Sequence, residues 1–292
     1  MIRNIPELIC IRDIIRYAVT QFNKNQIFFG HGNDNSFDEA VNLILQTLKL
    51  EPDLLEIFLD ARLLEKEISL ILDYIEKRVK DRIPIAYLTK ESWLNGYKFF
   101  VDERVIIPRS YLAEILLDKD IIDNNIEDIL DLCTGSGCLA ILAAIKFKNA
   151  NIDAIDISED ALEVANKNIN LYRLNQQIKT YKSNLYSSLE KNKKYDLIIC
   201  NPPYVNMESM NILPKEYSYE PKIALYGGIN GMDLIEKIIK QSKHYLKDNG
   251  IILLEIGNEF NNFMKMFKYL KPHWFHEDHL YKKILMLKYD QL

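Results

Sequence analysis

The sequence is poor in cysteine and glycine and has no long apolar run. Only four cysteines and ten glycines occur in 292 residues. The cysteines form no C-x-x-C pair and no disulfide framework, which favours small buried side chains in a reducing compartment. No uncharged run approaches the roughly 20 residues that span a bilayer, and the first residues lack a signal-peptide pattern. We therefore expect a soluble, cytoplasmic protein.

The sequence also lacks an excess of basic residues. Its 42 aspartates and glutamates outnumber 37 lysines and arginines, for a net charge of −5. A protein that binds nucleic acid chiefly through phosphates usually has a basic excess. The acidity argues against such a partner without excluding a local basic patch, and it fits a basic protein partner. The length allows one large domain or two modest ones.

Residues 1–84 predict a small helical domain. Apolar residues recur at helical spacing at Ile11, Ile14, Ile15 and Ala18. Ser36 and Glu39 are spaced as in a capping box and predict the start of another helix. A last helix is expected at 67–82, and Pro84 ends it. We expect this domain to recognise the substrate.

Beyond residue 84 the pattern predicts a β-hairpin linker and then an α/β domain. In residues 85–107 apolar and polar residues alternate on either side of Asn95-Gly96, which is a strong hairpin signal. Strands and helices then alternate through the domain at 108–292, which predicts a doubly wound, mostly parallel sheet. The expected strands are 129–132, 152–156, 179–182, 195–200, 251–256 and 284–287, with helices at 139–147, 159–171 and 233–246.

A glycine loop follows the first of these strands. It reads Asp131-Leu132-Cys133-Thr134-Gly135-Ser136-Gly137 and opens a helix. The glycines allow a tight turn and the close approach of a ligand to the backbone. Together with Ala140 they also satisfy the dinucleotide fingerprint G-x-G-x-x-A. A nicotinamide dinucleotide therefore remains open on the glycines alone.

Acidic residues around this loop favour a different cofactor. Asp156 ends the second strand, 19 residues after Gly137, where an acid accepts hydrogen bonds from ribose hydroxyls. Asp131 suits an ammonium group, which S-adenosylmethionine has and NAD lacks. Asn184 is placed to bond the adenine edge. The expected cofactor residues are Asp131, Cys133, Thr134, Gly135, Ser136, Gly137, Asp156, Ile157, Asn184, Leu185 and Asn201. Surface carboxylates at strand ends are the alternative for the two acids.

The turn Asn201-Pro202-Pro203-Tyr204 comes directly out of the apolar run at 197–200. Prolines cannot continue a strand ladder, so a rigid turn is expected at the sheet edge where α/β proteins bind ligands. The Asn201 side-chain oxygen and the Pro202 carbonyl can each accept a hydrogen bond from an NH₂ group, and Tyr204 offers a flat face. This arrangement predicts methylation of a planar amide or amino nitrogen, with no metal required. A purely structural turn is the alternative.

With both motifs present, the chain resembles the class I S-adenosylmethionine-dependent methyltransferases of the HemK/PrmC/PrmB family, which methylate glutamine side chains in proteins. The resemblance also rests on Ile107-Pro108-Arg109, Val205, Glu220-Pro221 and Gly227-Gly228 with Gly231. It implies a Rossmann-like, seven-stranded sheet and S-adenosylhomocysteine as product. It also implies Asn201, Pro202, Pro203 and Tyr204 as the catalytic turn, with Arg109 beside the substrate.

Within that family the chain resembles the PrmB branch. The other main bacterial branch, which modifies release factors, typically has Ile-Pro-Arg-Pro-Glu-Thr-Glu, where this chain has Ile-Pro-Arg-Ser-Tyr-Leu-Ala-Glu at 107–114. Gly30-His31-Gly32 and the segment 86–89 also fit PrmB. The resemblance implies that the substrate is a glutamine of the third protein of the large ribosomal subunit. Ribosome assembly is one stage at which this glutamine could be methylated. The family pattern has proline at Tyr111 and an acid at Asn184. Nothing demands a dimer, so we expect a monomer.

Two other functions and one metal site are alternatives to this interpretation. Amino-methyltransferases of nucleobases use a similar turn but need a base-flipping pocket and a basic track. The second alternative function is a module that binds S-adenosylmethionine without catalysing methyl transfer. His273, His276 and His279 are three residues apart, which suggests a metal site, but no cysteine or acid motif accompanies them. A surface or loop role is therefore expected for these histidines.

Overall fold

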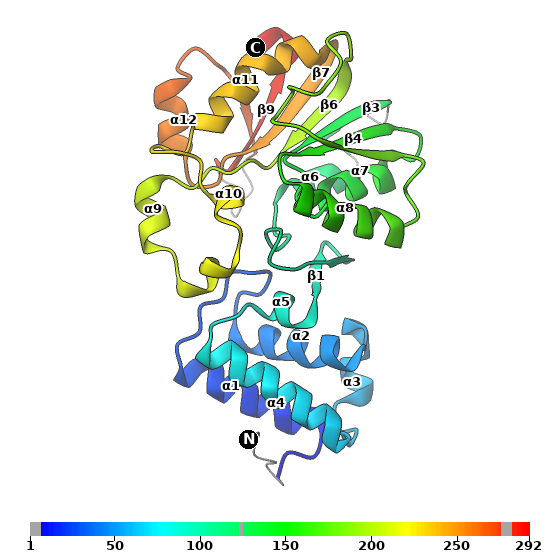
Figure 1. Cartoon of the computed structure of the whole chain (residues 1–292), viewed down its shortest axis with the longest axis vertical. Coiled ribbons are helices and arrows are strands. Elements are labelled where there is room, and N and C mark those ends of the chain that lie inside the picture. The colour runs from blue at the N-terminus through cyan, green and yellow to red at the C-terminus, as the bar shows by residue number, and fades with distance from the viewer. Residues whose placement is uncertain (1–6, 119, 123–124, 276–281) are drawn as a thin grey trace.

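The structure, a computed structural model, describes residues 7–118, 120–122, 125–275 and 282–292. It has a helical bundle at one end and an α/β domain at the other, with a short hairpin between them (Figure 1). The bundle comprises α1 (Ile11–Lys24), α2 (Ser36–Leu48), η1 (Pro52–Leu54), α3 (Leu55–Phe58) and α4 (Glu65–Lys80). Its apolar core is formed mainly by α1, α2 and α4, as the helical spacing of the isoleucines predicts.

The start of α2 differs from the capping box that its sequence suggests. Asn35 is the N-cap, and its side chain accepts hydrogen bonds from the backbone N–H groups of Phe37 and Asp38 at 3.0 and 2.9 Å. Asparagine in an extended conformation is among the best N-caps. Glu39 is instead 2% exposed and pairs with Arg78 of α4. Glu39, which the local pattern assigned to capping, is thus used in an ion pair with Arg78 instead.

The segment after the bundle begins with a helix that was not expected. Residues of α5 (Ile85–Thr89) form a short helix, begun by the Pro84 carbonyl, which accepts from the Tyr87 N–H at 3.0 Å. The predicted hairpin follows, with β1 (Glu91–Leu94) antiparallel to β2 (Tyr97–Phe100). Asn95 and Gly96 both have positive φ, at 48° and 79°. That conformation suits a two-residue hairpin turn.

The α/β domain is built on a seven-stranded, mostly parallel sheet in the order β5-β4-β3-β6-β7-β9-β8, which confirms the predicted fold class. Its strands are β3 (Asp128–Leu132), β4 (Asn151–Asp156), β5 (Ile178–Lys182), β6 (Tyr195–Cys200), β7 (Leu246–Glu255), β8 (His273–Trp274) and β9 (Ile284–Lys288). The two-residue strand β8 was not expected. In the parallel register Leu132 pairs with both Ile155 and Cys200. The segments that follow β3, β4 and β6 therefore leave the sheet side by side.

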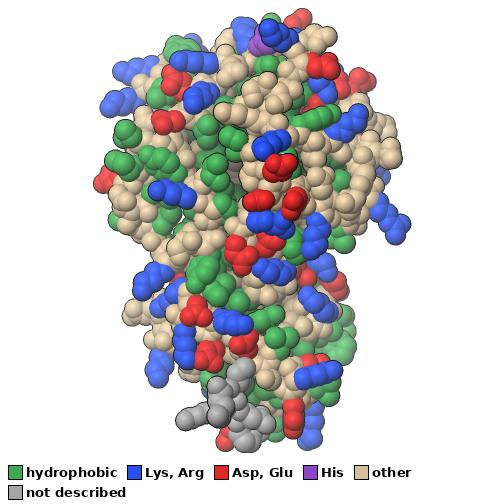
Figure 2. Space-filling model, in the orientation of Figure 1, with side chains coloured by type: hydrophobic (Ala, Val, Ile, Leu, Met, Phe, Trp, Pro, Cys, Tyr) green, Lys and Arg blue, Asp and Glu red, His purple; other side chains and the backbone are tan. Residues whose placement is uncertain are grey.

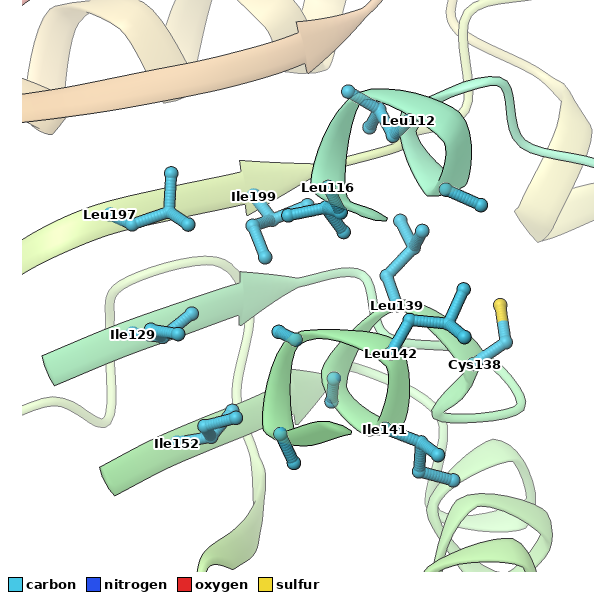
Figure 3. Close-up of a cluster of buried hydrophobic side chains, with 14 of the residues drawn as sticks. Leu112, Leu116, Ile129, Cys138, Leu139, Ile141, Leu142, Ile152, Leu197 and Ile199 are labelled. Carbon is cyan, nitrogen blue, oxygen red and sulfur yellow. The ribbon is translucent and has the colours of Figure 1, made fainter. Parts of the chain in front are cut away.

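Helices cover both faces of this sheet. On one face lie α6 (Leu112–Leu117), α7 (Cys138–Lys146) and α8 (Glu159–Leu171), and on the other α11 (Asp233–Tyr245) and α12 (Phe260–Met266). Figure 3 shows Leu116 of α6 beside Ile199 of β6, with α7 covering the same face. The shorter elements α9 (Met207–Ile212), η2 (Lys215–Tyr219) and α10 (Lys222–Leu225) lie between β6 and α11, and η3 (Tyr289–Gln291) ends the chain.

Three sequence expectations concern the cysteines, the C-terminal histidines and membrane spans. Cys138 and Cys200 are buried, whereas Cys10 and Cys133 are half-buried. Of the three histidines, His273 lies in β8, and the expectation for the other two falls outside the described residues. Among the described residues there is no group of His, Cys, Asp or Glu that could hold a metal ion. No described helix is long and apolar enough to cross a membrane.

Candidate active site

Two pockets meet at the carboxyl ends of the parallel strands. The first, here named the glycine-loop pocket, is lined by seven of the expected cofactor residues: Cys133, Gly135, Asp156, Ile157, Asn184, Leu185 and Asn201. Asp131, Thr134, Ser136 and Gly137 do not line it. The second, here named the NPPY pocket, is lined by Asn201, Pro202 and Tyr204 of the turn and by Arg109. Asn201 therefore lies between the two pockets.

The glycine loop turns through three residues with positive φ. These are Cys133, Gly135 and Gly137, at 60°, 55° and 78°. A Cβ atom on Gly137 would lie 3.2 Å from the Cβ of Ala165 in α8, so a larger residue would press on that helix. A Cβ atom on Gly135 would meet no atom within 4 Å. The positive φ at Gly135, rather than crowding, therefore favours glycine there, and the missing side chain leaves open space on the pocket side.

Asp156, the last residue of β4, supports this loop and lines the pocket. Its Oδ2 accepts a hydrogen bond from the Gly135 N–H at 2.9 Å, and its Oδ1 accepts one from the Ser158 N–H at 2.9 Å. Burial raises the pKa of this carboxyl, and the backbone donors partly oppose the shift. Each carboxylate oxygen has a second lone pair for a ligand.

Asp131 lies behind the loop, where the sequence alone could not place it. Its side chain is fully buried, and its Oδ2 accepts from the Thr134 hydroxyl at 2.5 Å and from the Ala140 N–H at 3.1 Å. Its Oδ1 is buried without a hydrogen-bond partner among the described residues. Burial raises the pKa of Asp131 to about 7. This carboxyl shapes the loop and leaves one oxygen unsatisfied.

The third strand brings Asn184 and Leu185 to the same pocket. Ser183 ends the extended segment: its N–H donates to the Asp156 carbonyl at 2.9 Å, and its hydroxyl donates to the Leu185 carbonyl at 2.6 Å. Leu185 has a φ of 51°, so the chain turns sharply here. The pocket thus combines a carboxylate, an amide and apolar walls.

Tyr204 of the turn is held chiefly by Glu255, a residue that no sequence motif marked. Its hydroxyl donates to Glu255 Oε1 at 2.9 Å, and the Ser110 hydroxyl donates to Glu255 Oε2 at 2.5 Å. A Cβ atom on Gly257 would lie 2.3 Å from Tyr204 Cε2. Burial raises the pKa of both Tyr204 and Glu255. The end of β7 therefore fixes the ring of Tyr204, which only strand pairing could have indicated.

Arg109 lines the NPPY pocket but its charge is already engaged. Its Nη1 and Nη2 donate to the two carboxylate oxygens of Glu220 at 2.5 and 2.7 Å, and its Cζ lies 5.4 Å from the ring centroid of Tyr217. Burial would raise the pKa of Glu220, but Arg109 and His31 lower it to about 2. Tyr111, where the family pattern has proline, packs against the sheet core and lines neither pocket.

Comparison with known proteins identifies the fold and the family of this chain. The family model of the methyltransferase small domain matches residues 111–213. The human Mettl16 catalytic domain, solved with an RNA hairpin, superposes with a TM-score of 0.53 at 17% identity, covering 76% of this chain and 81% of that one. That likeness concerns the fold alone. The matched region contains the glycine loop and the turn at Asn201, and the family model is that of a methyltransferase domain.

Two full-length relatives narrow this class. The ribosomal protein uL3 glutamine methyltransferase of Bordetella pertussis is 48% identical over 99% of this chain and 98% of its own length. That of Burkholderia pseudomallei is 49% identical over 90% of this chain and 89% of its own. The chain belongs to the family of ribosomal protein uL3 glutamine methyltransferases. The family predicted from the motifs is confirmed.

Proposed function

We propose that this protein transfers a methyl group from S-adenosylmethionine to the side-chain nitrogen of a glutamine in ribosomal protein uL3, leaving S-adenosylhomocysteine. The observation that carries the proposal is the position of Asn201, which lines both the glycine-loop pocket and the NPPY pocket. A residue shared by two adjoining pockets can hold an acceptor nitrogen where it faces a methyl donor. The names of the relatives support glutamine as the acceptor residue and uL3 as the acceptor protein.

The residues of the glycine-loop pocket fit S-adenosylmethionine. Asp156 would accept hydrogen bonds from the ribose hydroxyls with its free lone pairs, and Asn184 would bond the adenine edge through its amide. Asp131, with an unsatisfied Oδ1 behind the loop, would favour the ammonium group electrostatically. Bound there, the cofactor supplies an electrophilic methyl group. The proposed methyl transfer uses no metal.

The turn would activate a weak nucleophile. An amide nitrogen is poorly nucleophilic because its lone pair is delocalised into the carbonyl. The Asn201 side-chain oxygen and the Pro202 carbonyl would each accept one hydrogen bond from the NH₂ group, orienting the nitrogen and favouring the pyramidal form. The ring of Tyr204, fixed by Glu255, would hold the amide plane. Once methylated, the cationic nitrogen loses a proton to water.

The surroundings of the NPPY pocket favour a protein acceptor over a nucleobase. Glu255 and Glu259 line it, and the cation Arg109 is paired with Glu220. Exposed apolar side chains stand on the adjoining segments: Met207, Ile212 and Ile229, exposed by 48, 79 and 73%. On the face in Figure 2, lysines and arginines are interspersed with acids rather than gathered into a track. Phosphates would need such a track, whereas a protein segment can use apolar contacts.

The direct test is methyl transfer to purified acceptors. The protein is incubated with methyl-labelled S-adenosylmethionine and, separately, with unmodified uL3, unmodified release factor and ribosomal RNA, and labelled residues are mapped by mass spectrometry. We expect label on one glutamine of uL3. Label on release factor alone would transfer the assignment to the other branch, and label on RNA would overturn it. Cofactor binding without transfer to any acceptor would indicate a binding module.

Asp131 predicts a measurable pH dependence of stability. Burial raises its pKa from an ordinary 3.8 to about 7, so the folded state holds this proton more tightly than the unfolded state. The resulting stabilisation is complete below the unfolded pKa and is lost as pH rises through about 7. Urea unfolding without cofactor should therefore show the wild-type free energy of unfolding falling over this window relative to Asp131→Asn. Parallel pH profiles for the two proteins would contradict the raised pKa.

A further inference from the structure

A buried ionic cluster joins the helical bundle to the wall of the NPPY pocket. Arg78 of α4 is only 1% exposed. Its Nε donates to Glu39 Oε1 at 2.5 Å, its Nη1 to Glu216 Oε1 at 3.3 Å, and its Nη2 to the Phe28 carbonyl at 2.7 Å. Glu39 and Glu216 are each 2% exposed. Arg78 and Glu39 belong to the bundle, whereas Glu216 belongs to η2, more than a hundred residues further along the chain.

Element η2 is tied to the bundle at both of its ends. Glu216 also accepts from the Phe28 N–H at 3.2 Å and lies 3.5 Å from Nη1 of Arg82. The hydroxyl of Tyr219 donates to the Asp81 carbonyl at 2.6 Å. Figure 1 shows the segment that carries α9 and η2, drawn in yellow, extending from the sheet to the N-terminal helices.

Between these two attachments stands Tyr217, which lines the NPPY pocket. Its ring centroid lies 4.5 Å from that of His31, in the loop before α2, and 5.9 Å from that of Phe28. Its other neighbour is Arg109, already held by Glu220. The bundle thus fixes one side of Tyr217 and the α/β domain the other. Among the described residues, none of the bundle lines either pocket, and Tyr217, which the bundle contacts, lines the NPPY pocket but not the glycine-loop pocket.

The cluster is a costly way to join two parts of a chain. Removing charges from water carries a large desolvation penalty, which their mutual attraction offsets only when the geometry is good. Apolar residues would join η2 to the bundle at least as firmly, but an ionic cluster fixes one geometry because its partners must meet in a single arrangement. We propose that Arg78 and Glu216 are positioning residues, through which the helical bundle sets the acceptor side of the active site by fixing Tyr217. The substrate class in this inference rests on the proposed function.

The positioning role is tested with Glu216→Gln, which preserves size and an acceptor oxygen but removes the charge. Because displacement of a site group by about 1 Å can cost about 100-fold, we expect kcat/KM for uL3 to fall by about 10- to 100-fold, through a higher KM. The Kd for S-adenosylmethionine, measured by calorimetry, should not change. The matched control is Thr89→Val, which removes a buried 2.7 Å hydrogen bond to Gln46 of α2 without touching η2.

A second variant and a readout without substrate keep the test independent of the proposed function. Tyr219→Phe removes only the hydrogen bond to Asp81. We expect backbone hydrogen exchange in residues 213–220 to accelerate in Glu216→Gln and in Tyr219→Phe, and to remain at the wild-type rate in Thr89→Val. Unchanged exchange there in both η2 variants, an unchanged KM for uL3 in Glu216→Gln, or an equal rise in KM in Thr89→Val, would overturn the positioning role. If wild type methylates no uL3 but exchange responds as expected, the proposed substrate fails, while the ordering of η2 and Tyr217 by the bundle stands and its KM effect is measured with whichever acceptor the wild type labels.

Discussion

Replacement of Asn201 by alanine should nearly abolish methyl transfer while the protein stays folded. In the proposed reaction the side-chain oxygen of Asn201 orients the acceptor NH₂ group and stabilises positive charge that develops on nitrogen. Loss of one preorganised group of this kind typically lowers kcat by about 100- to 1,000-fold. Asn201 is half-buried, and no described residue hydrogen-bonds its side chain. Its removal should therefore leave the fold and most of the cofactor affinity intact.

The measurement is single-turnover transfer to uL3 at saturating cofactor, with thermal unfolding and calorimetry on the same preparations. The matched control is Asn211→Ala, which removes an exposed asparagine on α9 in the adjoining segment. It should react at the wild-type rate. Wild-type turnover by Asn201→Ala would remove Asn201 from the chemistry and leave the glutamine acceptor without its proposed holder.

Replacement of Asp156 by alanine should weaken the binding of S-adenosylmethionine. A hydrogen bond to a charged group contributes about 1.5–3 kcal/mol, so losing two ribose hydrogen bonds should raise Kd by at least about 100-fold. The carboxylate also accepts from the Gly135 N–H, so its loss should loosen the glycine loop as well. Because burial raises the pKa of Asp156, cofactor affinity should fall as acid protonates this carboxyl.

Calorimetric titration with S-adenosylmethionine provides the measurement, and two further variants separate the causes. Asp156→Asn retains an oxygen that can accept from Gly135, so its Kd should lie between those of wild type and Asp156→Ala. Asp160→Ala removes an exposed acid in the first turn of α8 and should bind as wild type does. Equal affinity in all four proteins would remove Asp156 from the cofactor site.

The helical bundle has a more specific connection to the site than its sequence indicated. From sequence it was expected to recognise the substrate. In the structure its charged cluster contacts η2 and thereby Tyr217, on the acceptor side of Asn201. A contribution to acceptor choice can therefore pass through the wall of the NPPY pocket, in addition to any contact that the outer surface of the bundle makes.

Expectations from local sequence succeeded where the signal lies within one strand, loop and helix. The glycine loop and the turn at Asn201 were placed correctly at the ends of β3 and β6, because apolar strands followed by glycine or proline leave few other conformations. The predicted capping box at Ser36 was wrong because Asn35 and Ser36 are adjacent residues that both favour the N-cap position. Asn35 caps the helix, and Glu39 is free to meet Arg78 across the bundle.

By itself the sequence determined the fold class, the family, and the positions of the glycine loop and the turn at Asn201, since those depend on short-range pattern and residue type. Only the tertiary structure decided that Asp131 is buried behind the loop and that Asn201 lies between two pockets. It also brought Glu255 to Tyr204 across 51 residues and Arg78 to Glu216 across 138. Such contacts depend on how strands and domains pack, and no local spacing in the chain specifies them.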